Sequence, residues 1–552
     1  MLLAAAGAMA CTNFIVGKKA SKDGSVICSY SADSYGMFQG LVHYPAARHQ
    51  KGEMRKVFDW DTNKYYGEIA EAEETYNVIG NINEWQVTIG ETTFGGREEM
   101  VDTTGIIDYG SLIYIALQRS RTAREAIDIM TSLAEQYGYN SEGETFTICD
   151  PDEAWIMEMM GAWMPDSIKS TLKPAARKQL GRTVWVALRI PDDMICGHAN
   201  QSRITTFNMK DKTGDVLFSK NVVSYARQRG WFSGKDEEFS YNAAYAFPDF
   251  QGRRICDARV WSFFNRNVDG MDKYLPYINC EDLTLEMPLY CKPKQKLSVR
   301  SMMQGMRDHY EGTPLDITGD IGAGAYGQPY RPSPLSAKVG DKEYFNERPT
   351  STYQTGFSIV AQMRADLPDA IGGIAWWAND DPNMAAYTPV YCSVNDIPQC
   401  YVRVENVQDE ITFSWKSAYW ICNTVANIVY PYYFKMFPDL EEARNELEFD
   451  FYDHQHEVEA KAQELYKTSP DAAKAYLTEY SQQCADKMMD RWNELFKFIV
   501  VKHNDVVVKP TEGKQFKRSE YGLGAGVKRP GFTEEYWKKI ANETGDRYLM
   551  KK

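Results

Sequence analysis

This chain of 552 residues has neither a long basic run nor a long apolar run. It has no block of lysine and arginine, and its 62 basic and 76 acidic side chains give a formal net charge of −14. Nucleic-acid binding needs clustered positive charge that displaces counterions, so no nucleic-acid partner is expected. A run of about 18 apolar residues is also missing. The most apolar late segment is interrupted by Asn423, Asn427 and Pro431, so no transmembrane segment is expected.

Several well-known catalytic and metal-binding motifs are absent too. The chain has no HExxH, no GxSxG and no CxxC, which argues against a zincin protease, an α/β-hydrolase serine enzyme and a structural zinc site. Asp453, His454 and His456 could bind a metal, but in a charged helical segment such a cluster more often faces solvent. No metal and no organic cofactor is expected. The ten cysteines besides Cys11 could form disulfides or act as small buried apolar residues, and the sequence leaves this open.

Aromatic residues, by contrast, are abundant, with 13 Trp, 35 Tyr and 24 Phe. They can bury ample apolar surface, so a folded chain is expected rather than a disordered one. The length allows roughly two to four domains, or one large α/β core with appendages.

Short β-rich runs and amphipathic helices alternate along the chain. Residues 12–16 and 26–30 flank the turn signal Asp23-Gly24 and predict a hairpin that starts at Cys11. Hydrophobic periodicity predicts further strands and helices: strands at 86–89, 145–148, 154–157 and 184–188, and helices at 110–119 and 122–137. Long charged stretches at 440–467 and 471–500 predict a helical C-terminal extension. The order of elements predicts layered α/β or α+β packing.

The first ten residues resemble the apolar and cleavage regions of a secretory signal. Ala8, Met9 and Ala10 fit the small-x-small rule and place the cut directly before Cys11. The basic start of such a signal is missing, so the alternative is a merely apolar N-terminus. We expect residues 1–10 to be a remnant leader and the protein to be exported, to a periplasmic, outer-surface or extracellular location of the bacterial type.

A cysteine freed at the N-terminus would carry its own base. Its α-amino group titrates near about 7.7 to 8.0, so it can accept a proton at neutral pH while the thiol attacks. Either a signal peptidase or self-cleavage could remove the leader. The alternative is a lipid anchor on Cys11, but lipidation signals usually carry a leucine two places before the small residue that precedes the cysteine, and this chain has Ala8 there, which favours the nucleophile.

Residues 11–25 closely resemble the N-terminus of the C69 dipeptidases, N-terminal-nucleophile hydrolases related to bile salt hydrolases and penicillin V acylase. Similar segments continue to about Met436, at residues 83–92, 198–203, 257–261, 307–313, 375–378 and 417–420. The resemblance implies an α+β fold in which residues 11–436 form a four-layer αββα catalytic sandwich. Cys11 would begin a central strand, and residues 437–552 would be the helical extension.

The resemblance also implies catalytic roles. Cys11 matches the nucleophile and its freed amine the base. Asp33 matches the acid that hydrogen-bonds near the nucleophile and orients this amine. Asn200 matches the asparagine whose amide donates to the oxyanion of the tetrahedral intermediate. Arg259 matches the arginine held close to the thiol, where a cation favours thiolate.

Substrate-binding and further oxyanion residues are expected on two other segments. A second oxyanion partner is implied near the end of the segment from Asn83 to Thr92. The wider superfamily often has asparagine there, whereas this chain has Glu91 and Thr92, so a backbone N–H or Thr92 could substitute. Tyr30 stands where many relatives have arginine, which leaves open how a substrate carboxylate would be held. His309 is expected to be structural.

Together these features predict an exported cysteine dipeptidase acting on dipeptides or short peptides. One alternative is a related amidase acting on conjugated bile acids or N-acyl amines. Another, of a different class, is a lipid-anchored, aromatic-rich glycan-binding surface protein, although a hairpin starting at Cys11 leaves no flexible tether. The C-terminal helices could cover the active-site mouth or mediate assembly into a homo-oligomer, and both alternatives stay open.

Overall fold

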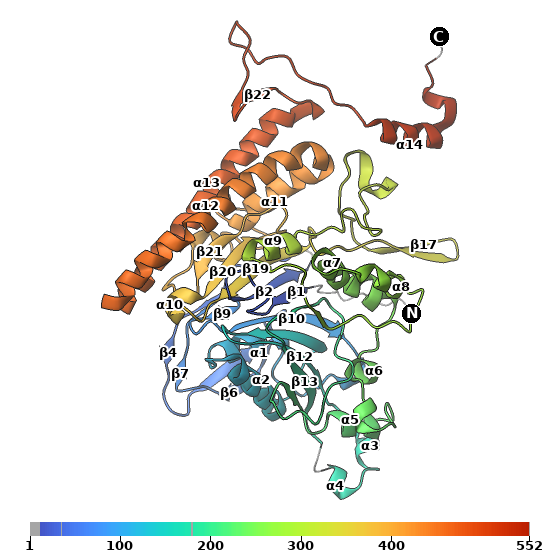
Figure 1. The fold of residues 1–552 in the computed structure, drawn as a ribbon, viewed down its shortest axis with the longest axis vertical. Coiled ribbons are helices and arrows are strands. Elements are labelled where there is room, and N and C mark those ends of the chain that lie inside the picture. The colour runs from blue at the N-terminus through green and yellow to red at the C-terminus, as the bar shows by residue number, and fades with distance from the viewer. Residues whose placement is uncertain (1–10, 35, 178–179, 551–552) are drawn as a thin grey trace.

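Two large antiparallel sheets form the centre of the protein (Figure 1). The computed structural model describes residues 11–34, 36–177 and 180–550, so the predicted leader lies outside the described residues. The first sheet runs in the order β16 (Tyr290–Cys291), β14 (Ile195–His198), β1 (Thr12–Val16), β2 (Val26–Asp33), β19 (Thr355–Met363), β20 (Ile374–Asn379), β21 (Thr388–Tyr391). The second runs β15 (Val216–Phe218), β13 (Thr183–Ile190), β12 (Ala154–Gly161), β11 (Gly143–Cys149), β10 (Thr88–Gly95), β9 (Ile82–Asn83), β8 (Val78–Ile79), β3 (His43–Tyr44).

The remaining strands form small two-stranded sheets: β4 (Ala47–Arg48) with β7 (Glu74–Thr75), β5 (Met54–Phe58) with β6 (Tyr65–Ala70), β17 (Ser336–Val339) with β18 (Lys342–Phe345), and β22 (Thr511–Glu512) with β23 (Gln515–Phe516). The helices are α1 (Tyr109–Leu117), α2 (Ala123–Tyr137), α3 (Asp166–Lys169), α4 (Pro174–Arg177), α5 (Val222–Gln228), α6 (Tyr241–Tyr245), α7 (Ala258–Asn267), α8 (Leu275–Ile278), α9 (Val299–Met306), α10 (Asp369–Gly372), α11 (Ala418–Val429), α12 (Tyr433–Thr468), α13 (Pro470–His503) and α14 (Glu534–Thr544). Antiparallel sheets with helices around them confirm the predicted α+β class. Of the helices in the described residues, none combines the length and apolarity that crossing a membrane would need.

The predicted N-terminal hairpin is present and lies inside the first sheet. Its strands pair antiparallel, with Thr12 opposite Ser31 and Val16 opposite Ile27. Every residue of β1 is buried, because helices cover one face of the strand and the second sheet covers the other. Phe14 faces α7 and stacks on Phe263, with ring centroids 4.1 Å apart.

The other face of β1 contacts β10 of the second sheet. Side chains alternate along a strand, so Asn13 points away from Phe14. Its Nδ2 donates to the carbonyl of Glu91 over 2.7 Å. A Cβ atom on Gly90 would come within 2.3 Å of Asn13 Oδ1, so glycine lets the two sheets approach closely here. Cys11 comes directly before β1 and is therefore held next to β10.

Helices pack on both sheets. Helices α1 and α2 contact the second sheet. In the first sheet, α11 contacts β20 and α13 contacts β21. Helix α2 begins where predicted, because the Thr122 side chain accepts a hydrogen bond from the Glu125 N–H and so caps it. In Figure 1, α1 and α2 lie beside β12 and β13 of the second sheet, and α11 to α13 lie above the first sheet.

The C-terminal region is helical, as predicted. Helices α12 and α13 form a long antiparallel pair joined at Ser469, which caps α13 by accepting from the Ala472 N–H. The proposed domain limit at residue 436 falls inside α12. Glu448 of α12 forms a buried ion pair with Arg307 and accepts from the Tyr387 N–H, so the helix pair is tied closely to the sheet region.

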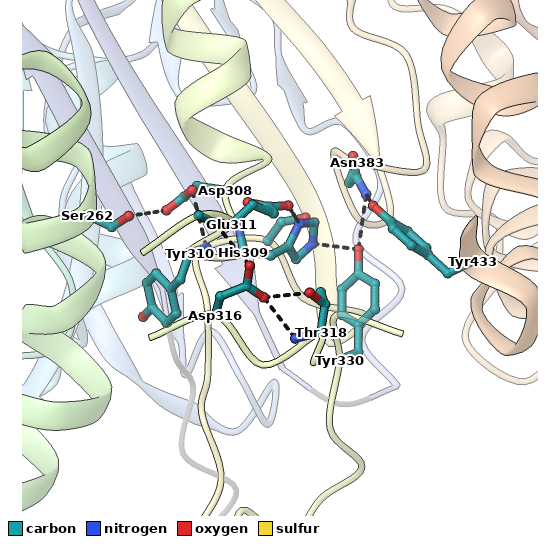
Figure 2. Close-up of polar contacts among 12 residues, drawn as sticks. Ser262, Asp308, His309, Tyr310, Glu311, Asp316, Thr318, Tyr330, Asn383 and Tyr433 are labelled. Carbon is teal, nitrogen blue, oxygen red and sulfur yellow. Dashed lines mark hydrogen bonds and ion pairs between the residues drawn. The ribbon is translucent and has the colours of Figure 1, made fainter. Parts of the chain in front are cut away.

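A buried polar cluster around His309 joins the segment after α9 to the start of α12 (Figure 2). His309 Nδ1 lies 2.9 Å from Glu311 Oε1, and Nε2 lies 2.9 Å from the Tyr330 hydroxyl. Asn383 donates to the hydroxyls of Tyr330 and of Tyr433, the first residue of α12. These contacts agree with the structural role that was predicted for His309.

This cluster makes stability depend on pH. Burial lowers the pKa of His309, but Glu311, with Asp381 and Asp308 nearby, outweighs burial and raises the pKa above 6.5. A raised folded-state pKa stabilises the protein fully below the unfolded pKa, and this contribution disappears as pH rises through the folded pKa. We expect His309→Gln to lower the free energy of unfolding by about 1.5–3 kcal/mol at pH 6. Urea unfolding of both proteins at pH 6 to 9 should show this difference shrinking, and a difference that grows with pH would contradict the assignment.

Candidate active site

Cys11 is enclosed at the N-terminal end of β1. Its side chain is 0% exposed. On the side of α7, Arg259 Nη1 donates to the carbonyl of Cys11 over 2.7 Å and to Thr12 Oγ1 over 2.8 Å. Arg259 is also fully buried and follows a π-helical segment, Gly252–Asp257, which often occurs at functional sites. The arginine therefore positions the backbone of the predicted nucleophile.

Arg259 also holds Asn200, which follows β14. Arg259 Nη2 donates to Asn200 Oδ1 over 3.0 Å and to the carbonyl of Ala199 over 3.1 Å. Asn200 adopts a left-handed backbone conformation with φ of 57°, which asparagine tolerates better than most residues. Its Nδ2 donates to the carbonyl of Thr93 over 2.8 Å. The guanidinium thus fixes the amide so that its donor end points toward β10.

Asp33 lies at the end of β2, beside Cys11. Its backbone N–H lies close enough to the Cys11 sulfur to lower the pKa of the thiol. Its carboxylate forms a buried ion pair with Arg348 and accepts from Thr355 Oγ1 over 2.6 Å and from Ser31 Oγ over 3.2 Å. Burial raises the pKa of Asp33 above 3.8, although Arg348 opposes this. The structure therefore brings Cys11, Asp33, Asn200 and Arg259 together.

Two buried acids complete the surroundings of the thiol, and the sequence analysis did not identify either as a site residue. Cys11 Sγ lies 3.3 Å from Glu91 Oε1, and the Tyr30 hydroxyl donates to the same oxygen over 2.7 Å. Glu144 of β11 interacts with Glu91 and accepts from Thr93 Oγ1 over 2.6 Å. Burial raises the pKa of both acids, and Glu91 raises that of Glu144 further. We call Glu91 and Glu144 the acid pair.

The surroundings of Cys11 disfavour the thiolate form. Burial raises the pKa of Cys11 well above 9.0, and the acids Glu91 and Asp33 raise it further, against the backbone N–H of Asp33. The predicted role of Arg259 in favouring thiolate stays a prediction. Its guanidinium donates to the carbonyl oxygen of Cys11, and this contact acts on the position of the backbone.

Two other predicted residues are engaged elsewhere. The Thr92 hydroxyl lies 2.7 Å from His198 Nδ1, and burial lowers the pKa of this histidine to about 3, so it is neutral. The amide of Asn83 donates to the carbonyls of Leu117 and Ser120. Its oxygen accepts from two backbone N–H groups, those of residues 85 and 87. Neither side chain contacts Cys11 through these bonds, so their substrate or oxyanion roles remain predictions without support from this geometry.

Some of these neighbours left a trace in the sequence and others did not. Glu91 and Glu144 are acids inside strand-like runs of small, β-branched and aromatic residues, where an ionisable side chain points to a special environment. Arg348 left no signal, because it lies 315 residues from Asp33 in a loop. The eleven cysteines, all within the described residues, are free thiols. No group of three or more His, Cys, Asp or Glu in the described ranges is arranged to hold a metal.

The comparisons with known proteins all point to one family. The sequence model of peptidase family C69 matches residues 10–41 and 37–446. A probable dipeptidase of Salmonella dublin is 26% identical over 409 residues, which cover 71% of this chain and 82% of that protein. A probable dipeptidase B of Lactococcus lactis is 23% identical over 509 residues, covering 89% and 95%. Dipeptidase A of Lactobacillus helveticus is 22% identical over 458 residues, covering 78% and 84%.

Proposed function

The chain belongs to peptidase family C69, and we propose that it is a cysteine dipeptidase with Cys11 as nucleophile. The observation that carries the proposal is that Arg259 of α7 bonds both to the Cys11 carbonyl and to Asn200 after β14, while Asp33 of β2 lies beside the thiol. The names of its relatives support dipeptides as the substrate class.

The proposed reaction starts once the peptide bond before Cys11 has been cut. The freed α-amine, positioned by Asp33, accepts the thiol proton as the sulfur attacks the scissile carbonyl carbon. Asn200 Nδ2 and a backbone N–H stabilise the oxyanion. The C–N bond then breaks, the protonated amine passes its proton to the leaving amine, and a thioester remains. Water attacks the thioester, which releases the carboxylic acid and restores the thiol.

The layering of the fold, the leader and export, and the assembly of the protein are also part of this proposal. We infer that the two sheets and their outer helices form the four-layer αββα sandwich of N-terminal-nucleophile hydrolases; the contacts of β1 with β10 and of α1, α2, α11 and α13 with the sheets support this. We also propose that residues 1–10 are a leader and that the mature protein is exported. Assembly into a homo-oligomer is a further part of the proposal.

A substrate panel tests the proposed activity. Protein beginning at Cys11 is assayed with a set of dipeptides and with glycocholate, which represents the related amidases. Dipeptide cleavage with little glycocholate cleavage is expected. Rapid glycocholate turnover without dipeptide cleavage would replace the proposed substrate class, and a protein that cleaves neither but binds glycans would favour the lipid-anchored surface protein. Intact-mass analysis of the exported protein shows whether Cys11 is free or lipidated.

Asn200→Asp tests the oxyanion role. Aspartate tolerates the same backbone conformation and can pair with Arg259, but it cannot donate from the Nδ2 position. We expect kcat of the folded protein to fall about 10²- to 10³-fold, and the urea midpoint to fall as well, because the bond to the Thr93 carbonyl is lost. Asn83→Ala is the contrast, because it removes bonds to backbone carbonyls and should lower stability while kcat of the folded protein persists. An Asn200→Asp variant with normal kcat would remove Asn200 from the mechanism.

A further inference from the structure

The acid pair lies where a cation would be expected to bind. Within the described residues, the partners of its carboxyl oxygens are hydroxyls, the Cys11 thiol and the other acid. Glu91 Oε2 and Glu144 Oε2 are buried and accept no hydrogen bond from a described N–H or O–H group. Two buried carboxyls that face each other are stable only if they share a proton or hold a positive charge between them.

The strand register explains why these two acids meet. Antiparallel pairing places Thr93 opposite Glu144 and Glu91 opposite Phe146. Residues two apart on a strand share a face, so Glu91, Thr93 and Glu144 all point to the same side of the second sheet. Gly90 and Thr92, on the other side, contact Asn13 and His198 of the first sheet, and the Glu91 carboxyl still reaches the thiol of Cys11 directly before β1. The acid pair is therefore built into two neighbouring strands and does not depend on a mobile loop.

The distance from the thiol is compatible with the ammonium group of a substrate. In an amino acid residue with a free N-terminus, the ammonium nitrogen lies about 2.5 Å from the carbonyl carbon of the same residue. A sulfur poised for attack lies about 3–3.5 Å from that carbon. An acceptor 3.3 Å from Cys11 Sγ, the position of Glu91 Oε1, is thus within ion-pairing reach of the ammonium group. The Tyr30 hydroxyl bonds to the same oxygen and fixes its orientation.

We propose that the acid pair binds the free α-ammonium group of the residue whose carbonyl is attacked, with Glu91 in direct contact and Glu144 behind it. This specificity rests on the proposed dipeptidase function. The ammonium replaces the proton that the two carboxyls share in the empty site. A substrate whose N-terminus is blocked or missing cannot form this ion pair, so the acid pair gives its transition state no stabilisation. The enzyme therefore releases N-terminal residues and does not cleave inside longer blocked chains.

The wild-type protein beginning at Cys11 gives the first test. L-alanyl-L-alanine is compared with propionyl-L-alanine, which has the same acyl chain without the amine and is no larger. We expect kcat/KM for alanyl-alanine to be at least about 10³-fold higher, because a close, desolvated charge pair between ammonium and carboxylate contributes several kcal/mol. Equal cleavage of both compounds would overturn the ammonium site and leave the proposed peptidase function standing. Cleavage of neither these compounds nor any other dipeptide would refute the function and the site together.

Variants then assign the preference to the acid pair. Glu91→Gln should reduce the ratio of the two kcat/KM values at least 100-fold, mainly through slower cleavage of alanyl-alanine. Glu91→Asp keeps the charge and should keep part of the preference, and it serves if Glu91→Gln fails to fold. Glu142→Gln, on the residue before β11 that interacts with Glu144 only through its charge, is the matched control and should keep the wild-type ratio. An unchanged ratio in a folded Glu91→Gln or Glu91→Asp protein would overturn the proposal.

Discussion

Replacing Cys11 by alanine is expected to abolish amide hydrolysis, with a loss of about 10⁴-fold or more in kcat. The wild-type chain that keeps residues 1–10 is expected to be inactive as well, although its thiol is intact. In that chain the nitrogen of Cys11 belongs to a peptide bond and cannot accept a proton. Burial and the neighbouring acids hold the pKa of the thiol well above 9.0, so little thiolate exists without a base. Release of the leaving group from a dipeptide checks this result. It is measured for the wild-type protein beginning at Cys11, for its Cys11→Ala variant and for the wild-type chain that keeps residues 1–10.

Cys28→Ala is the matched control for this prediction. Cys28 is another buried thiol, on the neighbouring strand β2 and opposite Ile15 of β1. It lies outside the group of side chains around Cys11, so its removal should lower stability moderately and preserve kcat. Full activity of a chain whose leader is verified as intact by mass spectrometry would refute the role of the α-amine. Full activity of Cys11→Ala would refute the nucleophile.

The second large effect is expected from Arg348→Met. Arg348 and Asp33 form an ion pair whose side chains are 2% and 0% exposed. Removing one partner leaves a buried charge uncompensated, which typically costs about 3–5 kcal/mol of stability. Protonation of Asp33 would relieve part of this cost, but a neutral acid would hold the α-amine of Cys11 less well. We therefore expect a lower urea midpoint and, under conditions where the variant is folded, a reduced kcat.

A double variant separates the two effects. Asp33→Asn combined with Arg348→Met removes both charges, so stability should recover in part while kcat remains low. Arg364→Met is the matched control. This variant breaks another buried ion pair, the one between Arg364 and Glu459. Arg364 directly follows β19, at the opposite end of the strand from Thr355. We expect a similar loss of stability and a normal kcat in that variant. Recovery of kcat in the double variant would show that the Asp33 carboxylate is dispensable.

Local features of the sequence were sufficient for the secondary structure near the site. The turn at Asp23-Gly24 and the flanking β-rich runs predicted the hairpin of β1 and β2, because these signals act over a few residues. The predicted strand at 86–89 was less accurate, since the structure places β10 at Thr88–Gly95. Glu91 in that segment departs from the expected pattern of strand residues because it belongs to the surroundings of the thiol.

The roles of neighbours around Cys11 were harder to predict. Arg259 was placed correctly beside Cys11, but its preferred contact with the carbonyl oxygen depends on how α7 packs against β1. Thr92 and Glu91 are adjacent in sequence, and strand alternation sends them to opposite faces, Thr92 to His198 and Glu91 to the thiol. A sequence comparison could not choose between them, because the register of β10 against β1 and β11 decides which one faces Cys11.

The sequence by itself determined the α+β class, the helical C-terminal region, the family and the position of the candidate nucleophile. All of these follow from local periodicity or from a continuous motif. Only the tertiary structure decided that Glu91 and Glu144 form a pair beside the thiol, that Arg348 forms an ion pair with Asp33, and that burial and nearby acids raise the pKa of the thiol. Each of these depends on charges and burial contributed by strands and loops that are far apart in the chain. Electrostatic energies in a desolvated site depend on distances of a few ångströms between such segments, and the sequence of one segment does not give these distances.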